Sequence, residues 1–213
     1  MHPPPILTAL LLGIALTVSW PARAQTERSG QLLLCSGCHG MNGEGRAGSG
    51  YPRIAGQSAA YIERQLEGYA SGLRRSPVME PLARALSGEE RRAISAHFSK
   101  LHAPNPSAAR IPAFAPVAHQ PERGEMLARF GDDGVRVQAC QNCHGALGRG
   151  HPPYNPYLAG LDKEYLRNEL TAWKSGARRT DPSGNMQVIA RNLNDSDIDA
   201  VSSYYAGLPP PAP

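Results

Sequence analysis

Several residue types are scarce in this chain of 213 residues, and each shortage narrows what the protein can be. Lysine occurs only three times, and the basic residues are scattered without interleaved aromatic side chains, which argues against a nucleic-acid surface. Aromatic residues make up only 6% of the chain, so two small domains would have thin cores and would need a staple, a metal or a cofactor. Beyond the first 24 residues, no segment is apolar enough to span a bilayer.

A convincing strand pattern is also missing. The periodic apolar residues recur at helical spacing and fall on one face of each helix. These residues are Tyr61, Ile62, Leu66 and Tyr69 in one segment and Tyr165, Leu166, Leu170 and Trp173 in another. Gly72 and Gly176 stand where these helices would end. Because glycine and proline are both abundant, at 22 and 20 residues, the sequence predicts an all-α protein with long loops.

The N-terminus carries the longest apolar run, ILTALLLGIALTVSW at residues 6–20. Ala22-Arg23-Ala24 follows it with the small-x-small pattern of a cleavage site. We therefore predict that residues 1–24 are a signal peptide, that the mature chain starts at Gln25 and that the protein is exported to the periplasm. The segment MHPPP lacks Lys and Arg, so an uncleaved membrane anchor is the alternative, although the run is short for a span of about 20 residues.

The remainder of the chain is a twofold repeat. The segment at residues 51–75 matches residues 155–179, and residues 79–101 match residues 186–208. Between the copies, residues 103–121 hold five prolines and are predicted to be a stiff linker. The sequence thus predicts two domains, at residues 25–102 and 122–213.

Charge is distributed unevenly between these two domains. Residues 25–102 hold ten basic and seven acidic residues, giving +3, whereas residues 121–213 hold ten basic and eleven acidic residues, giving −1. Such a dipole is typical of a protein that orients itself on charged partners.

All four cysteines lie in two copies of one pattern, CSGCHG at residues 35–40 and CQNCHG at residues 140–145. In C-x-x-C-H the two thiols are spaced to form thioethers with one haem, and the histidine is the proximal ligand of its iron. The chain is therefore predicted to carry two covalently bound haem c groups.

Other uses of paired cysteines fit the sequence poorly. A zinc site would join the two pairs across 101 intervening residues, far outside the usual ligand spacing. A thioredoxin-like motif needs a βαβ context, and a disulfide between residues three apart would close a small, strained loop.

Each iron then needs a sixth ligand, and two methionines occupy the same place in the repeat. Met79 lies 41 residues after Cys38, and Met186 lies 43 residues after Cys143. Both are expected on loops from which a thioether reaches the opposite face of a haem. The rival ligands are His97, His102 and His151. Ligation by one histidine and one methionine raises the reduction potential of a haem relative to ligation by two histidines. It also fills both axial positions of the iron, which favours electron transfer over catalysis.

Two prolines follow the haem motifs at matched spacing, Pro52 and Pro156. A ligating histidine usually donates its second ring N–H to a carbonyl. Their backbone carbonyls are candidates for that role, with an ordinary loop proline as the alternative.

The two C-x-x-C-H-G motifs, each followed by P-x-[IL]-A-G, a helix ending in G-x-R-R and a methionine before ALS or NLN, resemble the dihaem cytochrome c4 family over nearly all of the mature chain. The resemblance implies two class I cytochrome c domains packed face to face about a pseudo-twofold axis. It also implies the haem-binding residues: thioethers at Cys35, Cys38, Cys140 and Cys143, and axial pairs His39 with Met79 and His144 with Met186. The second copy departs from the pattern by an insertion at residues 131–138 and a longer loop before Met186.

Three functions compete for such a protein. The first is a periplasmic electron carrier that delivers toward a terminal oxidase, as family members commonly do. The second is the electron-accepting subunit of a dehydrogenase with a flavin-containing partner, such as flavocytochrome c sulfide dehydrogenase. The third, a dihaem enzyme of the peroxidase or thiosulfate dehydrogenase type, needs an open iron site, against which the matched methionines argue. We therefore predict an electron carrier without catalytic residues, associated with a membrane only through partners.

Overall fold

The structure, a computed structural model, describes residues 20–102 and 122–211, here called the first half and the second half. Within these ranges it consists of helices and loops with a few isolated β-bridges and no strand, so the all-α prediction is confirmed. No helix in the described part of the chain is long and apolar enough to cross a membrane. The linker at residues 103–121 and most of the predicted signal peptide lie outside the described residues.

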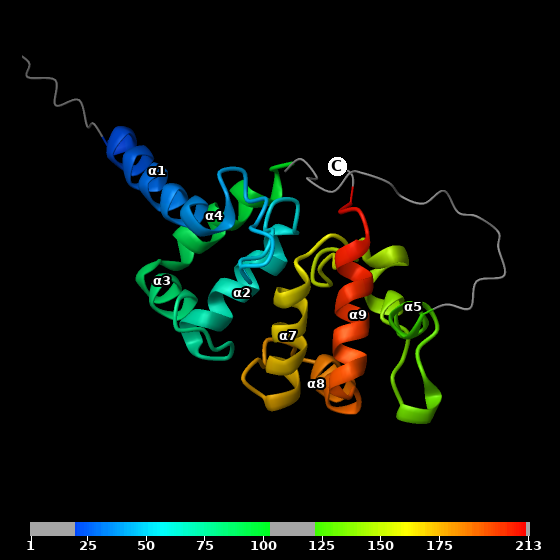
Figure 1. The fold of residues 1–213 in the computed structure, drawn as a ribbon. Coiled ribbons are helices and arrows are strands. Elements are labelled where there is room, and N and C mark those ends of the chain that lie inside the picture. The colour runs from blue at the N-terminus through cyan, green and yellow to red at the C-terminus, as the bar shows by residue number, and fades with distance from the viewer. Residues whose placement is uncertain (1–19, 103–121, 212–213) are drawn as a thin grey trace, which may run out of the picture.

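Each half contributes its own set of helices (Figure 1). The first half holds α1 (Trp20–His39), α2 (Ala59–Ser71), α3 (Met79–Ala85) and α4 (Gly88–Ser99). The second half holds α5 (Arg123–Arg129), η1 (Asp133–Val135), α6 (Gln141–His144), η2 (Ala146–Gly148), α7 (Lys163–Ser175), α8 (Asn185–Asn192) and α9 (Asp195–Gly207). The helix α1 runs through the predicted start of the mature chain at Gln25.

The central helices of the two halves, α2 and α7, begin and end in the same way. The side chains of Ser58 and Asp162 accept the backbone N–H of the third helical residue, Tyr61 or Tyr165. Such N-caps satisfy backbone donors that the first turn leaves unpaired. Both helices end at glycines in the left-handed conformation, with φ of 76° at Gly72 and 79° at Gly176, as the sequence predicts.

The last helices, α4 and α9, both start with a reciprocal capping box. Ser87 pairs with Glu90 at the start of α4, and Asn194 pairs with Asp197 at the start of α9. Ser-x-x-Glu and Asn-x-x-Asp at these positions have the spacing typical of a capping box, so these helix starts are readable in the sequence.

Each half has its own apolar core. In the first half the core joins α2, α3 and α4, and its buried members are Ile62, Leu66, Tyr69, Ala83, Ile94 and Phe98. In the second half it joins α5, α7 and α9, and its largest buried members include Leu127, Tyr157, Leu166, Leu193, Ile198 and Tyr205. Most of the apolar residues predicted on one face of α2 and of α7 therefore lie in these cores or pack against them.

The two halves meet through backbone pairing at matched positions of the repeat. Arg74 and Arg178 form an antiparallel bridge. Around it, the N–H of Arg75 donates to Ala177 O at 3.0 Å and the N–H of Arg179 donates to Leu73 O at 2.6 Å. These two bonds exchange places when the halves are exchanged, which is the signature of a pseudo-twofold axis. The face-to-face packing that the resemblance implies is present, and α2 lies beside α7 in Figure 1.

One local prediction needs correction. Met79 and Met186 are expected on loops, but Met79 is the first residue of α3 and Met186 is the second residue of α8. The insertion at residues 131–138 forms a tight loop that contains η1 and is closed by a β-bridge between Asp132 and Val137. Helices of seven or eight residues give too short a periodic signal to be recognised in a proline-rich segment.

Candidate haem sites

The two C-x-x-C-H motifs both lie on helical turns. In the first half, Cys35, Cys38 and His39 form the C-terminal end of α1. In the second half, Cys140 is the N-cap of the single-turn helix α6, which contains Cys143 and His144. A helical turn places residues i, i+3 and i+4 on one face, so both thiols and the imidazole of each motif face the same side. No disulfide joins any of these four cysteines.

The histidine rings of both motifs are held in one orientation. His39 Nδ1 lies 2.8 Å from Pro52 O, and His144 Nδ1 lies 2.9 Å from Pro156 O. Because a carbonyl only accepts, Nδ1 carries the proton in both rings and Nε2 is left with a free lone pair. Burial lowers the pKa of both imidazoles, which keeps the rings neutral as metal ligation requires. The role predicted for the Pro52 and Pro156 carbonyls is confirmed.

Glycines make this contact possible by letting two loops pack backbone to backbone. Gly45 has φ of +80°, and a Cβ atom there would lie 2.5 Å from Arg53 N. Gly150 has φ of +86°, and its Cβ would lie 2.8 Å from Tyr157 N. Only glycine fits both the left-handed backbone and the close approach. The glycine-rich stretch after the first motif therefore serves to bring the proline carbonyl to the histidine.

Both candidate sixth ligands sit at helix starts, and a side chain from the preceding loop accepts the backbone N–H of each. The N–H of Met79 donates to Ser76 Oγ at 3.1 Å, and the N–H of Met186 donates to a carboxylate oxygen of Asp181 at 2.8 Å. Met79 and Cys35 both pack against the core of the first half. Each methionine is half-buried.

In the second half, the predicted site residues line one cavity. Cys140, Cys143, His144 and Met186 all lie on its wall. The rest of the wall is mostly apolar and includes Leu158, Leu161, Leu166, Leu170, Trp173, Ile189, Leu193 and Val201. An apolar cavity with two thiols, a neutral imidazole and a thioether on its wall fits a covalently held haem c.

Polar atoms at the junction also fit such a group. Arg74 Nε is buried and has no partner within the protein, and the Arg178 side chain reaches the wall of the cavity in the second half. Buried guanidinium donors of this kind suit the carboxylate groups that a haem carries.

The rival histidine ligands lie elsewhere. His97, His102 and His151 are all exposed, and none lines the cavity. The zinc alternative would require the two cysteine pairs to meet, but among the described residues no group of three or more His, Cys, Asp or Glu side chains converges as metal ligands would.

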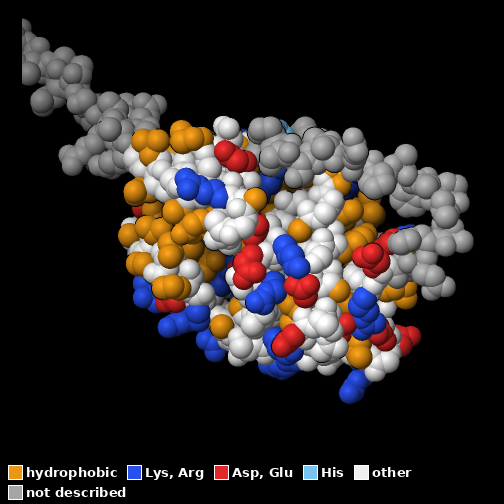
Figure 2. All heavy atoms as spheres, in the orientation of Figure 1, with side chains coloured by type: hydrophobic (Ala, Val, Ile, Leu, Met, Phe, Trp, Pro, Cys, Tyr) orange, Lys and Arg blue, Asp and Glu red, His pale blue; other side chains and the backbone are white. Residues whose placement is uncertain are grey.

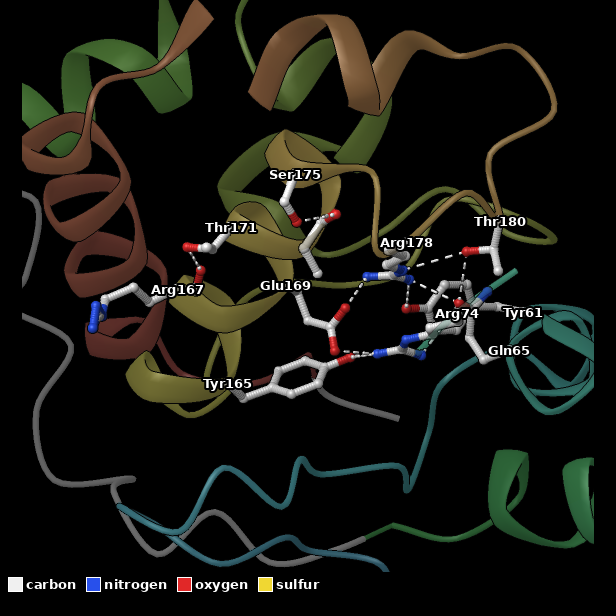
Figure 3. A network of polar contacts seen from close by, with 11 residues as sticks. Tyr61, Gln65, Arg74, Tyr165, Arg167, Glu169, Thr171, Ser175, Arg178 and Thr180 are labelled. Atoms are coloured by element: carbon white, nitrogen blue, oxygen red, sulfur yellow. Dashed lines mark hydrogen bonds and ion pairs between the residues drawn. The ribbon is translucent and has the colours of Figure 1, made fainter. Parts of the chain in front are cut away.

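A polar cluster at the junction was not recognised as functional from the sequence. It contains Tyr61, Gln65, Arg74, Tyr165, Glu169, Arg178 and Thr180 (Figure 3). The tyrosines and arginines do appear as matched pairs of the repeat, on the same helix face and at the same helix ends. The repetition of these tyrosines and arginines could have marked them as important, but a repeat in the sequence does not show that the two copies contact each other across the junction.

The fold and these paired sites define a c-type cytochrome with two haem sites, and comparison with known proteins agrees. The Cytochrome c family model matches residues 132–208. A cytochrome c4 of Pseudomonas aeruginosa is 30% identical over 95% of this chain and 98% of its own length. The chain belongs to the cytochrome c4 family, carries two covalent haem c groups, and is an electron carrier rather than an enzyme.

Other relatives have a more specific name. A "Thiosulfate dehydrogenase electron acceptor" of Stutzerimonas stutzeri is 38% identical over 83% of this chain and 79% of its own length. Among solved structures, reduced cytochrome c4 of Pseudomonas stutzeri has a TM-score of 0.72 at 28% identity, covering 86% of this chain and 97% of that one. Thiosulfate dehydrogenase (TsdBA) of Marichromatium purpuratum has a TM-score of 0.71 at 36% identity over 82% of this chain. The match spans only 36% of the TsdBA chain.

Proposed function

We propose that this protein accepts electrons from a thiosulfate dehydrogenase and passes them to a further redox protein. The observation that carries the proposal is the 38% identity to an electron acceptor of that enzyme, which exceeds the 30% identity to a cytochrome c4. Of the functions predicted from the sequence, this is the electron acceptor of a dehydrogenase, with thiosulfate dehydrogenase as the electron donor. It leaves a terminal oxidase, predicted from the family, as the onward acceptor.

The residue roles in this proposal rest on the repeat and, for the second half, are supported by the cavity that Cys140, Cys143, His144 and Met186 line. Cys35 and Cys38, and likewise Cys140 and Cys143, carry the thioethers. His39 with Met79, and His144 with Met186, are the axial pairs. When bound, each haem c takes up and releases one electron at its iron. The protein supplies neutral imidazoles oriented by carbonyls, thioethers anchored at helix starts, and apolar walls that exclude water.

The domain boundaries and the location complete the proposal. Residues 25–102 and 122–213 form the two cytochrome domains, and residues 103–121 join them. Residues 1–24 direct export, so the mature protein works in the periplasm. Membership of the cytochrome c4 family supports both statements.

The first half differs from the second in its exposed apolar side chains and in its net positive charge. Exposed apolar side chains gather there, and Figure 2 shows hydrophobic atoms clustered over α1 and α3. The exposed members are Leu33, Leu34, Met41, Leu73, Val78 and Leu82. Residues 25–102 also carry the net charge of +3. Several of these side chains neighbour Cys35, His39 and Met79 along the chain, so a bound haem would cover part of this apolar surface. The positive charge of the first half is the feature that favours an acidic redox partner.

The test is rapid mixing of the oxidised dihaem protein with a thiosulfate dehydrogenase and thiosulfate, with absorbance followed in the haem bands. We expect both haems to be reduced at a rate that rises with dehydrogenase concentration and falls with added salt. A matched reaction uses a flavin-containing sulfide dehydrogenase and sulfide.

Each result decides between donors. Reduction by the first system alone supports the proposal, and reduction by the second system alone replaces the proposed donor. If neither enzyme reduces haems that a chemical reductant does reduce, the protein is not the acceptor of either dehydrogenase.

A further inference from the structure

The junction between the halves is built from residues that occupy matched places in the repeat. Two arginines cross it, and each reaches a tyrosine of the opposite half (Figure 3). Arg74 Nη2 donates to the Tyr165 hydroxyl at 3.1 Å, and Arg178 Nη2 donates to the Tyr61 hydroxyl at 3.0 Å. Exchanging the halves turns one contact into the other.

This symmetry breaks at one pair of positions, Gln65 on α2 and Glu169 on α7. Gln65 Oε1 accepts from Arg178 Nη2 at 2.8 Å and from Arg74 Nη1 at 3.2 Å. At the matched position, Glu169 accepts from Arg178 Nη1 at 2.8 Å and also from Arg74. Both side chains therefore bridge the two guanidiniums, but only the one in the second half is charged.

The charges in this cluster are desolvated. The side chains of Arg74 and Arg178 are 5% and 6% exposed, and that of Glu169 is 18% exposed. Burial raises the pKa of Glu169, but the two guanidiniums outweigh it and hold that pKa below its usual value. The junction thus contains two cations and one carboxylate, and the carboxylate is ionised at neutral pH.

The carboxylate stands on a helix that lines the haem cavity of the second half. Glu169 and Gln65 both reach the cavity of the second half, but Glu169 stands on α7, the helix that also supplies Leu166, Leu170 and Trp173 to its lining, whereas Gln65 stands on α2 of the first half. A buried charge acts strongly on its surroundings because little water screens it. An oxidised iron carries one more positive charge than a reduced iron, so a nearby carboxylate stabilises the oxidised form and lowers the reduction potential.

We propose that Glu169 makes the two haems differ in reduction potential, because its charge lowers the potential of the second haem relative to that of the first. The protein holds this charge in place with two guanidiniums, Arg74 from the first half and Arg178 from the second. In the half-reduced protein the charge favours the electron on the first haem. The inference rests on the two covalent haems and is independent of which enzyme donates the electron.

The test is a redox titration of the intact dihaem protein and its variants, with each potential assigned to its haem by NMR of the haem methyl groups. In Glu169→Gln we expect both potentials to rise, and that of the second haem to rise more, because two guanidiniums are left without a carboxylate. In the exchange variant Gln65→Glu/Glu169→Gln the charge moves to the first half, so the potential gap should shift further in the same direction.

Controls separate charge from structure. Glu169→Asp keeps the charge and should keep the gap near its original size. Glu164→Gln removes an exposed carboxylate from the same helix, and solvent screening should leave the gap unchanged. Gln65→Glu adds a second carboxylate, should lower the potential of the first haem, and serves if Glu169→Gln does not fold.

The proposal is overturned if Glu169→Gln shifts both potentials equally, if it leaves them unchanged, or if Glu164→Gln has the same effect. Because all potentials are measured without a dehydrogenase, these outcomes do not depend on the proposed donor.

Discussion

At the scale of single residues, both haem sites depend on a backbone carbonyl that selects the histidine tautomer. Pro52 O and Pro156 O accept from the Nδ1 atoms of His39 and His144, so each Nε2 faces away from the loop with its lone pair free. A proline suits this role because its fixed φ keeps the loop extended. The same arrangement in both halves explains why the proline recurs at matched spacing.

The methionine ligands can be tested one at a time. Replacing Met79 or Met186 by Ala removes a thioether that raises the potential of one haem. We expect both haems to stay covalently attached while the potential of one falls, by a sizeable fraction of the about 0.8 V range that axial ligands span. A spectroelectrochemical titration measures the shift.

Met126 provides the matched control, since it lies on α5 and not on the wall of the haem cavity. Met126→Ala should leave both potentials in place. If Met79→Ala and Met186→Ala also leave them in place, the assigned axial pairs are wrong.

Most of the residues at the two sites are predictable from the sequence because chemistry dictates their spacing. Two thiols and an imidazole must fall on one helical turn, so Cys35, Cys38 and His39 are recognisable without a structure. The methionines are recognisable only through the repeat. Their position at the starts of α3 and α8 was missed because the hydrogen bonds from Met79 N–H to Ser76 and from Met186 N–H to Asp181 form within non-periodic segments.

At the scale of elements, the halves differ in how the helix before the haem motif packs. In the second half α5 crosses α9 at Gly124, where a Cβ atom would lie 2.3 Å from Ala200 O. In the first half, α1 has Gly30 before its motif, and a Cβ there would meet nothing within 4 Å. A close helix crossing therefore stabilises only the second half at this position.

This difference predicts opposite effects of adding a side chain. Gly124→Val should destabilise the second half by about 1–3 kcal/mol, because α5 and α9 must move apart. Gly30→Ala adds a better helix former in open space and should be neutral or stabilising by up to about 1 kcal/mol. Denaturant unfolding followed by circular dichroism measures both. Equal destabilisation by the two changes would mean that α1 packs as α5 does.

At the scale of the whole molecule, a buried ionic cluster joins the two halves. Arg74 and Arg178 share Glu169, and each guanidinium lies over an aromatic ring of its own half, Tyr69 or Trp173, at 4.5 and 4.4 Å from the centroid. A buried cluster of this kind specifies one arrangement of the halves, because a shifted arrangement would leave the guanidiniums unpaired. The junction therefore orients the two haem sites as well as holding them together.

The cluster makes stability depend on pH in a defined direction. The folded-state pKa of Glu169 lies below its ordinary value of 4.5, so folding favours the ionised form. Its contribution is fully present above about pH 4.5 and is lost as the pH falls through the lower folded-state value. The thermal midpoint of the original protein should therefore fall on acidification more steeply than that of Glu169→Gln.

Thermal unfolding between pH 3 and 6 measures this difference, and Glu164→Gln is the matched control. If the original protein and Glu169→Gln lose stability in parallel, the carboxylate does not hold the junction together.

The sequence by itself determined the helical class, the twofold repeat and the two haem motifs. These features are local, because helix periodicity, capping residues and C-x-x-C-H spacing all act within a few residues along the chain. Only the tertiary structure decided how the halves meet. The repeat shows that Arg74 matches Arg178 and that Gln65 matches Glu169, but it does not show that all four converge. That convergence depends on contacts between residues about 100 positions apart in the chain. Because the four residues meet, the replacement of Gln65 in one copy by Glu169 in the other places a charge at the junction that we propose makes the two haem sites differ.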